Sequence, residues 1–94
     1  MTHDQVRTVV FRHLHELVPG TAERSIDELA PLHDIGVDSL DLVDVASRSM
    51  QELEVKLPRA EVGRIRTMND LIQALHRSVL AARAEAESAA TGPA

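Results

Sequence analysis

Aliphatic residues recur at helical spacing in three separate segments of the 94-residue chain, and this pattern restricts the fold more than any other sequence feature. Spacings of three and four residues place side chains on one face of an α-helix. The pattern therefore predicts an all-α fold in which three amphipathic helices share one core. The apolar faces consist of Val6, Val9, Val10, Leu14 and Leu17; then Leu42, Val43, Ala46, Met50 and Leu53; then Met68, Leu71, Ile72, Leu75 and Val79.

Capping residues and helix breakers predict where the first two long helices lie. Thr2 is a suitable N-cap whose capping box Gln5 can close, and the helix ends before Pro19 and Gly20. Asp38 is a suitable N-cap for a second helix over residues 39–53, with the carboxylate of Asp41 in its first turn.

The remaining elements are a long first loop, a short helix and a last long helix. Residues 59–66 leave room for only a short helix, and Thr67 with Asp70 forms a capping signal for the last helix. The loop from residue 21 to residue 38 cannot be one regular helix because it contains Pro31. It is expected to form a helical turn or to be anchored on the core by Ile26, Leu29, Leu32 and Ile35.

The segment after Leu80 is rich in alanine and charged residues. Such a composition can prolong the last helix by one or two turns, and residues 91–94 are expected to be disordered. We therefore expect one domain over residues 1–80, followed over residues 81–94 by a helix extension and a disordered tail.

Composition excludes several classes of function. Phe11 is the only aromatic residue and the net charge is −5, which argues against binding to nucleic acid or to anionic membranes. The chain has no cysteine, and His13 and His15 lack metal-ligand spacing, so no metal site is expected. Without a signal-peptide pattern or an apolar run of membrane-spanning length, we expect a cytoplasmic protein, and we expect it to be a monomer.

Ser39 follows a glycine-bearing loop and opens the second helix. A hydroxyl at the first helical position is exposed and lies near backbone N–H groups that have no acceptor within the helix. The helix dipole also favours an anion there, such as a phosphate attached to the serine. Taken alone, these features are more typical of a serine that only starts a helix.

The order of these features resembles the acyl carrier proteins of fatty-acid and polyketide synthesis. The register of the resemblance holds from Val6 to Leu80. It implies an acyl-carrier-like bundle of four helices, three long and one short, with a long first loop, and it implies a carrier, not an enzyme. The matching segments are Asp34-Ile35-Gly36-Val37-Asp38-Ser39-Leu40-Asp41, Leu57-Pro58, Ile65-Arg66-Thr67-Met68 and Asp70-Leu71-Ile72.

In the family that the chain resembles, a phosphopantetheinyl transferase attaches 4'-phosphopantetheine to the serine that matches Ser39. The thiol at the end of this arm carries acyl groups as thioesters, which would supply the thiol that the sequence lacks. Further partners implied by the resemblance are acyl-loading enzymes, a ketosynthase and other enzymes of the pathway.

Partner enzymes of this family generally bind the acidic second helix. The residues that match this docking surface are Asp38, Asp41, Asp44, Arg48 and Glu52. Asp44 and Arg48 have the spacing of a weak surface ion pair. Arg48, the neutral Gln51 and a basic third-helix region depart from typical fatty-acid carriers. We therefore expect a role in polyketide or other specialised biosynthesis.

An acyl chain could lie between the helices of such a bundle. The residues expected near the cavity are Leu42, Ala46, Val62, Ile65 and Leu71. The same side chains suit ordinary core packing equally well, because a core and an apolar pocket use the same residue types.

Three other functions remain as alternatives. Peptidyl or aminoacyl carriers of non-ribosomal peptide assembly often show Gly-Gly before the His/Asp-Ser-Leu of the site, whereas this chain has Gly36-Val37. An unmodified helical interaction domain would use the acidic helix alone. A hydrolase using Ser39 lacks a base, because the sequence suggests neither a His–Asp pair nor a nucleophile elbow.

Overall fold

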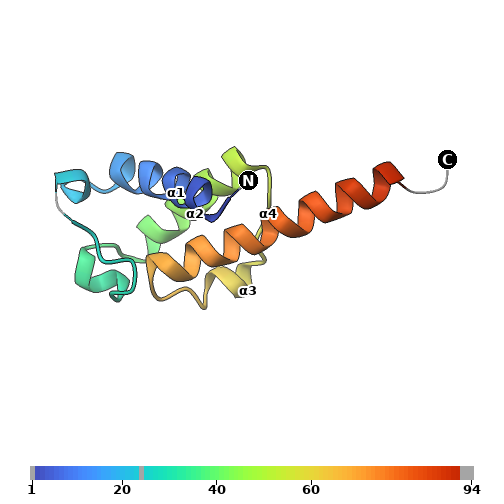
Figure 1. The fold of residues 1–94 in the computed structure, drawn as a ribbon. Helices are drawn as coiled ribbons and strands as arrows, with labels where there is room; N and C mark the ends of the chain where they lie inside the picture. Colours follow the sequence, from blue (N-terminus) through green and yellow to red (C-terminus); the bar gives the residue numbers. More distant parts are fainter. Residues whose placement is uncertain (1, 24, 92–94) are drawn as a thin grey trace.

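The computed structural model describes residues 2–23 and 25–91, which form a bundle of helices (Figure 1). Three α-helices are long and one is short, as predicted, and this part of the chain contains no β-strand. The α-helices are α1 (His3–Leu17), α2 (Ser39–Leu53), α3 (Arg59–Val62) and α4 (Met68–Thr91). Two 3-10 helices, η1 (Thr21–Glu23) and η2 (Leu32–Ile35), lie in the long first loop.

The predicted capping boxes start α1 and α4. In α1 the amide of Gln5 donates to Thr2 Oγ1 at 3.2 Å, and the amide of Thr2 donates to Gln5 Oε1 at 2.8 Å. Before α4 the amide of Asp70 donates to Thr67 Oγ1 at 3.0 Å, and Thr67 donates back to Asp70 at 3.2 Å. These side chains satisfy amides that the first turn of a helix leaves without partners.

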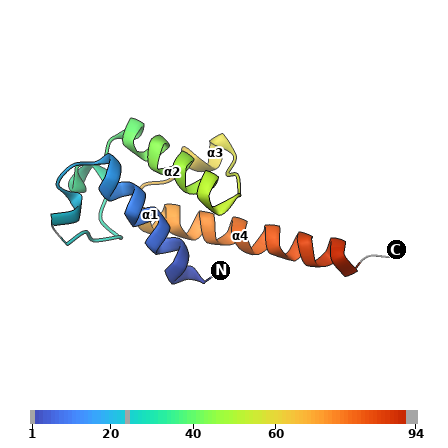
Figure 2. The same ribbon diagram turned by 90° about the horizontal axis from the view of Figure 1, so that it is seen from above.

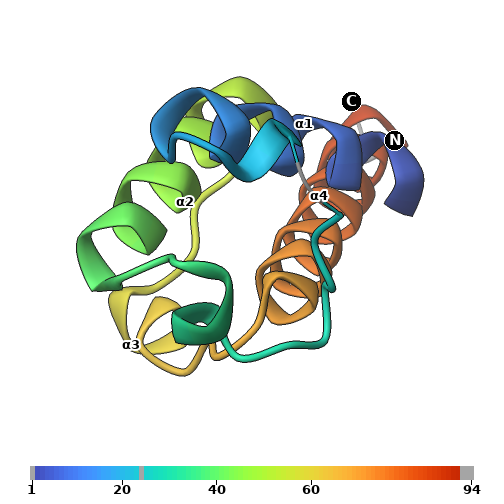
Figure 3. The same ribbon diagram turned by 90° about the vertical axis from the view of Figure 1, so that its left-hand side faces the viewer.

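The core lies where α1, α2 and α4 face one another, as the end-on view in Figure 3 shows. Val43 does not belong to it, and its predicted place in the inner stripe of α2 is wrong, since 52% of its surface is exposed. Val45 and Ser49, which are not part of the predicted stripe, are buried. The inner face of α2 is thus rotated away from Val43, because α2 packs against both α1 and α4.

The first loop is fastened to three elements. Arg7 of α1 forms an ion pair with Glu28, the amide of Asn69 donates to the Glu28 carbonyl at 2.9 Å, and the amide of Leu32 donates to the Arg66 carbonyl at 3.0 Å. Leu32 and Ile35 are buried as predicted, but Leu29 is 70% exposed, so its predicted role as an anchor is wrong. Next to Leu29 the loop is held by the backbone hydrogen bond from the Asn69 amide to the Glu28 carbonyl, and not by an apolar side chain.

α3 ends earlier than the predicted limit of residue 66. Gly63 caps it, and the side chain of Arg66 donates to the carbonyl oxygens of Gly63 at 2.9 Å and Ile65 at 3.3 Å. These carbonyls follow the end of the helix and are satisfied by the guanidinium instead of by further helical turns.

α4 continues well past the core (Figures 1 and 2). It reaches Thr91, so the extension after Leu80 is longer than the one or two turns predicted, as the run of alanines favours. Thr91 belongs to this helix, so its predicted disorder is wrong, and the predicted disorder of residues 92–94 lies outside the described residues. Within the described chain, no helix combines the length and apolar character needed to cross a membrane.

Candidate functional site

The loop before Ser39 is shaped by two buried side chains and a left-handed glycine. Ile35 and Val37 are buried on either side of Gly36, whose φ of 81° is readily adopted only by glycine. The amide of Gly36 donates to the His33 carbonyl at 3.3 Å, and that of Val37 donates to the Leu32 carbonyl at 3.0 Å. The turn therefore brings the chain out of the core directly into α2.

Ser39 is the first residue of α2, and its side chain is exposed. Asp38 is the N-cap, as predicted: its Oδ1 accepts from the Asp41 amide at 2.8 Å, while its own amide donates to Asp41 Oδ2 at 3.4 Å. The first intrahelical donor is the amide of Leu42. The amides of Ser39 and Leu40 therefore have no acceptor within the helix, and the helix dipole at this position favours an anion attached to the serine.

The five residues expected to form a docking surface occupy three different environments. Asp38 and Asp41 belong to the capping box. Asp44 and Arg48 are exposed and form no ion pair with each other, so the predicted pair is wrong. Glu52 contacts α1 instead. It lies about 20 Å along the helix from Ser39 at the standard rise per residue.

Glu52 is the centre of a polar cluster between α1 and α2. Arg12 forms an ion pair with Glu52 Oε2, and His13 Nε2 lies 3.0 Å from Glu52 Oε1. The hydrogen bond from Arg12 lowers the pKa of the Glu52 carboxyl below its ordinary value; burial opposes this, and the charge of Arg12 and the hydrogen bond with His13 assist it. We call Arg12, His13 and Glu52 the interhelical clasp.

Two apolar side chains beside Ser39 were not singled out from the sequence as surface residues. Leu40 is 77% exposed, and Val43 lies on the same outer side of α2. Leu40 falls outside the stripe that contains Leu42 and Ala46, so its exposure could have been predicted from the sequence. Large exposed aliphatic residues next to a functional position are typical of surfaces that contact a protein partner.

A hollow of about 620 Å³ lies beside Ser39 and is open to solvent. The expected cavity residues Leu42, Val62 and Ile65 line it, whereas Ala46 and Leu71 are not among its lining residues and are buried in the core. Its volume falls in the range of about 300–1,000 Å³ that ligand pockets occupy. The hollow also has polar lining residues: His33, Asp38, Ser39, Arg59 and Arg66.

The surroundings of Ser39 lack the contacts of a hydrolytic site. His33 Nε2 does lie 3.0 Å from Asp34 Oδ1, so the expectation that no His–Asp pair exists is wrong. However, both side chains are exposed, and His33 forms no hydrogen bond with Ser39. Within residues 2–23 and 25–91, no three His, Asp or Glu side chains gather in a group that could hold a metal ion.

Comparison with known proteins gives an independent result. Residues 12–75 match the family model described as "Phosphopantetheine attachment site", from α1 into α4. The polyketide biosynthesis acyl-carrier-protein AcpK of Bacillus subtilis (strain 168) is 22% identical over 82 residues, which cover 87% of this chain and all of that protein. No solved structure shows a significant match.

Proposed function

Because the chain belongs to the phosphopantetheine attachment family of acyl carrier proteins, we propose that Ser39 is the residue that carries the arm. Members of this family are carriers, not enzymes, and bear a covalently attached 4'-phosphopantetheine. The observation that carries the proposal is the position of Ser39: an exposed hydroxyl at the first residue of α2, beside two amides without helical acceptors.

The residues around Ser39 fit a phosphodiester at this position. Among the described residues no side chain forms a hydrogen bond with the hydroxyl, and the amides of Ser39 and Leu40 can donate to an attached phosphate. When bound, the arm supplies a terminal thiol that holds an acyl group as a thioester. The protein's own residues position the attachment point: Gly36 permits the turn, and Asp38 fixes the start of the helix.

The partners that we propose are a phosphopantetheinyl transferase, acyl-loading enzymes and a ketosynthase or other pathway enzymes. Their docking surface would combine the acidic side chains of Asp41 and Asp44 with the exposed aliphatic side chains of Leu40 and Val43. Acidic groups attract a basic partner over distance. The partner, once bound, covers the exposed aliphatic side chains.

A polyketide or other specialised pathway is the setting that we propose, with the protein acting as a cytoplasmic monomer. Two observations support this setting. The relative from Bacillus subtilis is named as a polyketide carrier, and the cationic Arg48 lies exposed on the same helix as the acidic Asp41 and Asp44.

Intact-mass measurement tests the attachment site. The apo protein is incubated with coenzyme A and a broad-specificity phosphopantetheinyl transferase; the wild type is expected to gain the mass of one arm, and Ser39→Ala is expected to gain none. Ser47→Ala, at an exposed serine of the same helix, is the matched control and should gain as much mass as the wild type. Failure of the wild type to gain mass, or gain by Ser39→Ala, would contradict the proposal.

Loading of the holo protein then separates the kinds of carrier. Acylation by acyl-loading enzymes without aminoacylation by adenylating enzymes is the expected result. The reverse preference would assign the protein to peptide assembly.

A further inference from the structure

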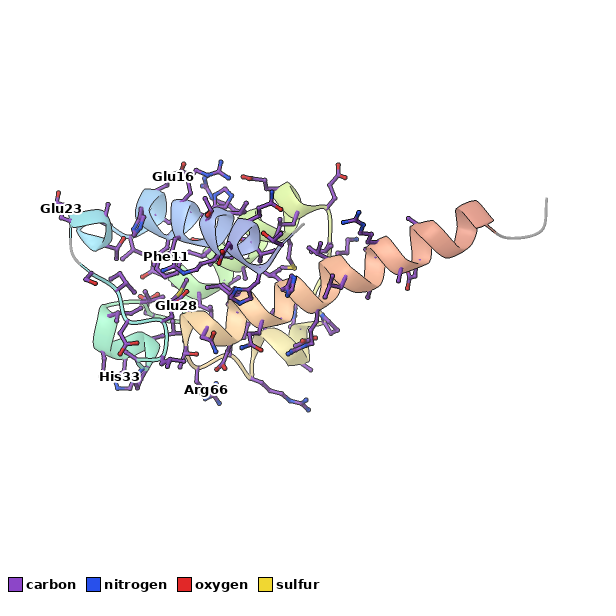
Figure 4. The ribbon with its side chains drawn as sticks, in the orientation of Figure 1. Phe11, Glu16, Glu23, Glu28, His33 and Arg66 are labelled. Carbon is purple, nitrogen blue, oxygen red and sulfur yellow. The ribbon has the colours of Figure 1, made fainter. Side chains whose placement is uncertain are left out.

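Two arginines line the hollow beside Ser39. Arg59 begins α3, and Arg66 follows it, while Ser39 and Asp38 contribute from the start of α2. Figure 4 shows Arg66 at the same end of the molecule as His33, which also lines this hollow. The hollow therefore combines apolar lining residues, Val37, Leu42, Val62 and Ile65, with two cationic side chains.

The position of Arg66 is fixed by the fold. Its carbonyl accepts from the amide of Leu32, which ties it to η2 and to the loop that leads to Ser39. Its guanidinium donates to the carbonyls of Gly63 and Ile65 through one nitrogen, Nη1. Arginine has five N–H donors, so others remain for an incoming oxyanion.

Arg59 has an exposed side chain and no carboxylate within ion-pair distance among the described residues. By contrast, Arg7, Arg12 and Arg77 pair with Glu28, Glu52 and Glu61. The one acid that lines the hollow, Asp38, already accepts the amide of Asp41 at 2.8 Å. The lining of the hollow therefore carries two cationic side chains and one carboxylate, which already accepts a hydrogen bond.

We propose that Arg59 and Arg66 bind an oxyanion carried by the arm on Ser39, and so hold the arm along the hollow between α2 and α3. This inference rests on the proposed attachment at Ser39. The oxyanion has two sources with the same chemistry: the phosphodiester next to Ser39, or a carboxylate at the end of a dicarboxylic acyl group. Guanidinium groups pair with both in a bidentate manner, and the apolar lining residues accommodate methylene groups.

NMR of the arginine side chains tests the proposal on four forms of the full chain: apo, holo, butyryl-loaded and malonyl-loaded. The Nε resonances of Arg59 and Arg66 are expected to shift when the oxyanion is present, while that of Arg64, which lines a different hollow, stays in place. A shift already complete in the holo form assigns the phosphodiester. A shift that appears only with malonyl, not with the similarly sized neutral butyryl group, assigns the cargo carboxylate.

Substitutions provide a second test of the proposal. Arg59→Gln is expected to remove most of the shift at Arg66, Arg59→Lys to keep part of it, and the matched control Arg64→Gln to leave it unchanged. The melting temperature of each variant verifies that it is folded. Among the described residues Arg59 forms no side-chain ion pair, so its substitution should not destabilise the protein.

The intact mass of every sample distinguishes failure of this inference from failure of the proposed attachment at Ser39. Shifts at Arg59 and Arg66 no larger than at Arg64, in samples whose mass proves modification at Ser39, would overturn this inference alone. Absence of any mass gain in the wild type would overturn the attachment and this inference together.

Discussion

The amide of Leu32 donates a hydrogen bond to the carbonyl oxygen of Arg66 at 3.0 Å, and so joins the loop before Ser39 to the connection between α3 and α4. Pro31 and Thr67 form an isolated bridge beside it, and the amide of Asn69 donates to the Glu28 carbonyl at 2.9 Å. These contacts lie between segments distant in sequence. The position of Ser39 relative to the hollow therefore depends on the whole bundle.

Removing the N-cap of α2 should destabilise the protein. Asp38→Ala deletes the carboxylate that accepts the Asp41 amide, and loss of such a cap typically costs about 1 kcal/mol. Urea unfolding measures the change. Asp44→Ala, at an exposed residue of the same helix, should alter the free energy of unfolding by less than about 0.5 kcal/mol. Equal effects of the two substitutions would show that the cap contributes nothing specific.

Reversing the charge of Asp44 should slow modification by a phosphopantetheinyl transferase. Asp44 is preferable to Asp41 for this test because it is outside the capping box. Asp44→Lys should lower the rate most at low ionic strength, because salt screens attraction between surface charges. Glu85→Lys makes the same charge change on the exposed part of α4 and should leave the rate near that of the wild type. Equal rates for both variants would place recognition elsewhere.

Leu40 and Leu42 should respond in opposite ways to substitution by alanine. Leu40 is 77% exposed, so Leu40→Ala should preserve stability but weaken partner binding by about 1 kcal/mol, roughly five-fold in affinity. Leu42 is buried, and Leu42→Ala should cost about 2–5 kcal/mol of unfolding free energy. Thermal unfolding and the KM of the transferase for each folded variant measure the two effects. An unchanged KM for Leu40→Ala would contradict a docking role.

The interhelical clasp should make stability depend on pH. The pKa of Glu52 is lowered from 4.5 in the folded protein, mainly by the hydrogen bond from Arg12. Its stabilisation is therefore present above the unfolded pKa and is lost as pH falls through the folded pKa. Glu52→Gln should lower the melting temperature near neutral pH, and the difference from the wild type should disappear in acid. A difference that stays constant down to pH values below both pKa values would show that ionisation of Glu52 is not its cause.

Ser49 should be replaceable by alanine with a gain in stability. Its side chain is fully buried, and its Oγ has no hydrogen-bond partner in the described part of the chain. Removal of an unsatisfied buried hydroxyl, together with the higher helix propensity of alanine, should stabilise the protein by roughly 1 kcal/mol. Chemical unfolding tests this, with Ser47→Ala at the exposed neighbouring position as the control for propensity alone. If Ser49→Ala proved less stable than the wild type while Ser47→Ala did not, the hydroxyl of Ser49 would have a hydrogen-bond partner.

Local signals in the sequence were sufficient to predict how the helices begin. Thr2 with Gln5, Asp38 with Asp41, and Thr67 with Asp70 form the predicted capping contacts. Such contacts involve residues three positions apart, so the chain needs no distant partner to form them. The placement of Ser39 at the start of α2 follows from the same local chemistry.

Which side of α2 faces inward depended on packing. Periodicity alone placed Val43 in the inner stripe and left Val45 out of it, but contact of α2 with both α1 and α4 buries Val45 and exposes Val43. Similarly, an ion pair predicted within α2 from spacing is absent, and Glu52 instead pairs with Arg12 across two helices. Competing partners from other elements cannot be identified from spacing along one helix.

By itself the sequence determined the four-helix order and the capped start of α2, because each depends on short-range spacing. It also identified the candidate attachment serine, through the resemblance of the register from Val6 to Leu80 to acyl carrier proteins. Only the tertiary structure decided what surrounds that serine. It placed Leu40 and Val43 at the surface and brought Arg59 and Arg66 around the hollow that Ser39 also lines. The physical reason is that Arg59 and Arg66 lie 20 and 27 residues beyond Ser39 in the chain, and only the packing of the helices and the backbone link from Leu32 to Arg66 bring them beside the same hollow.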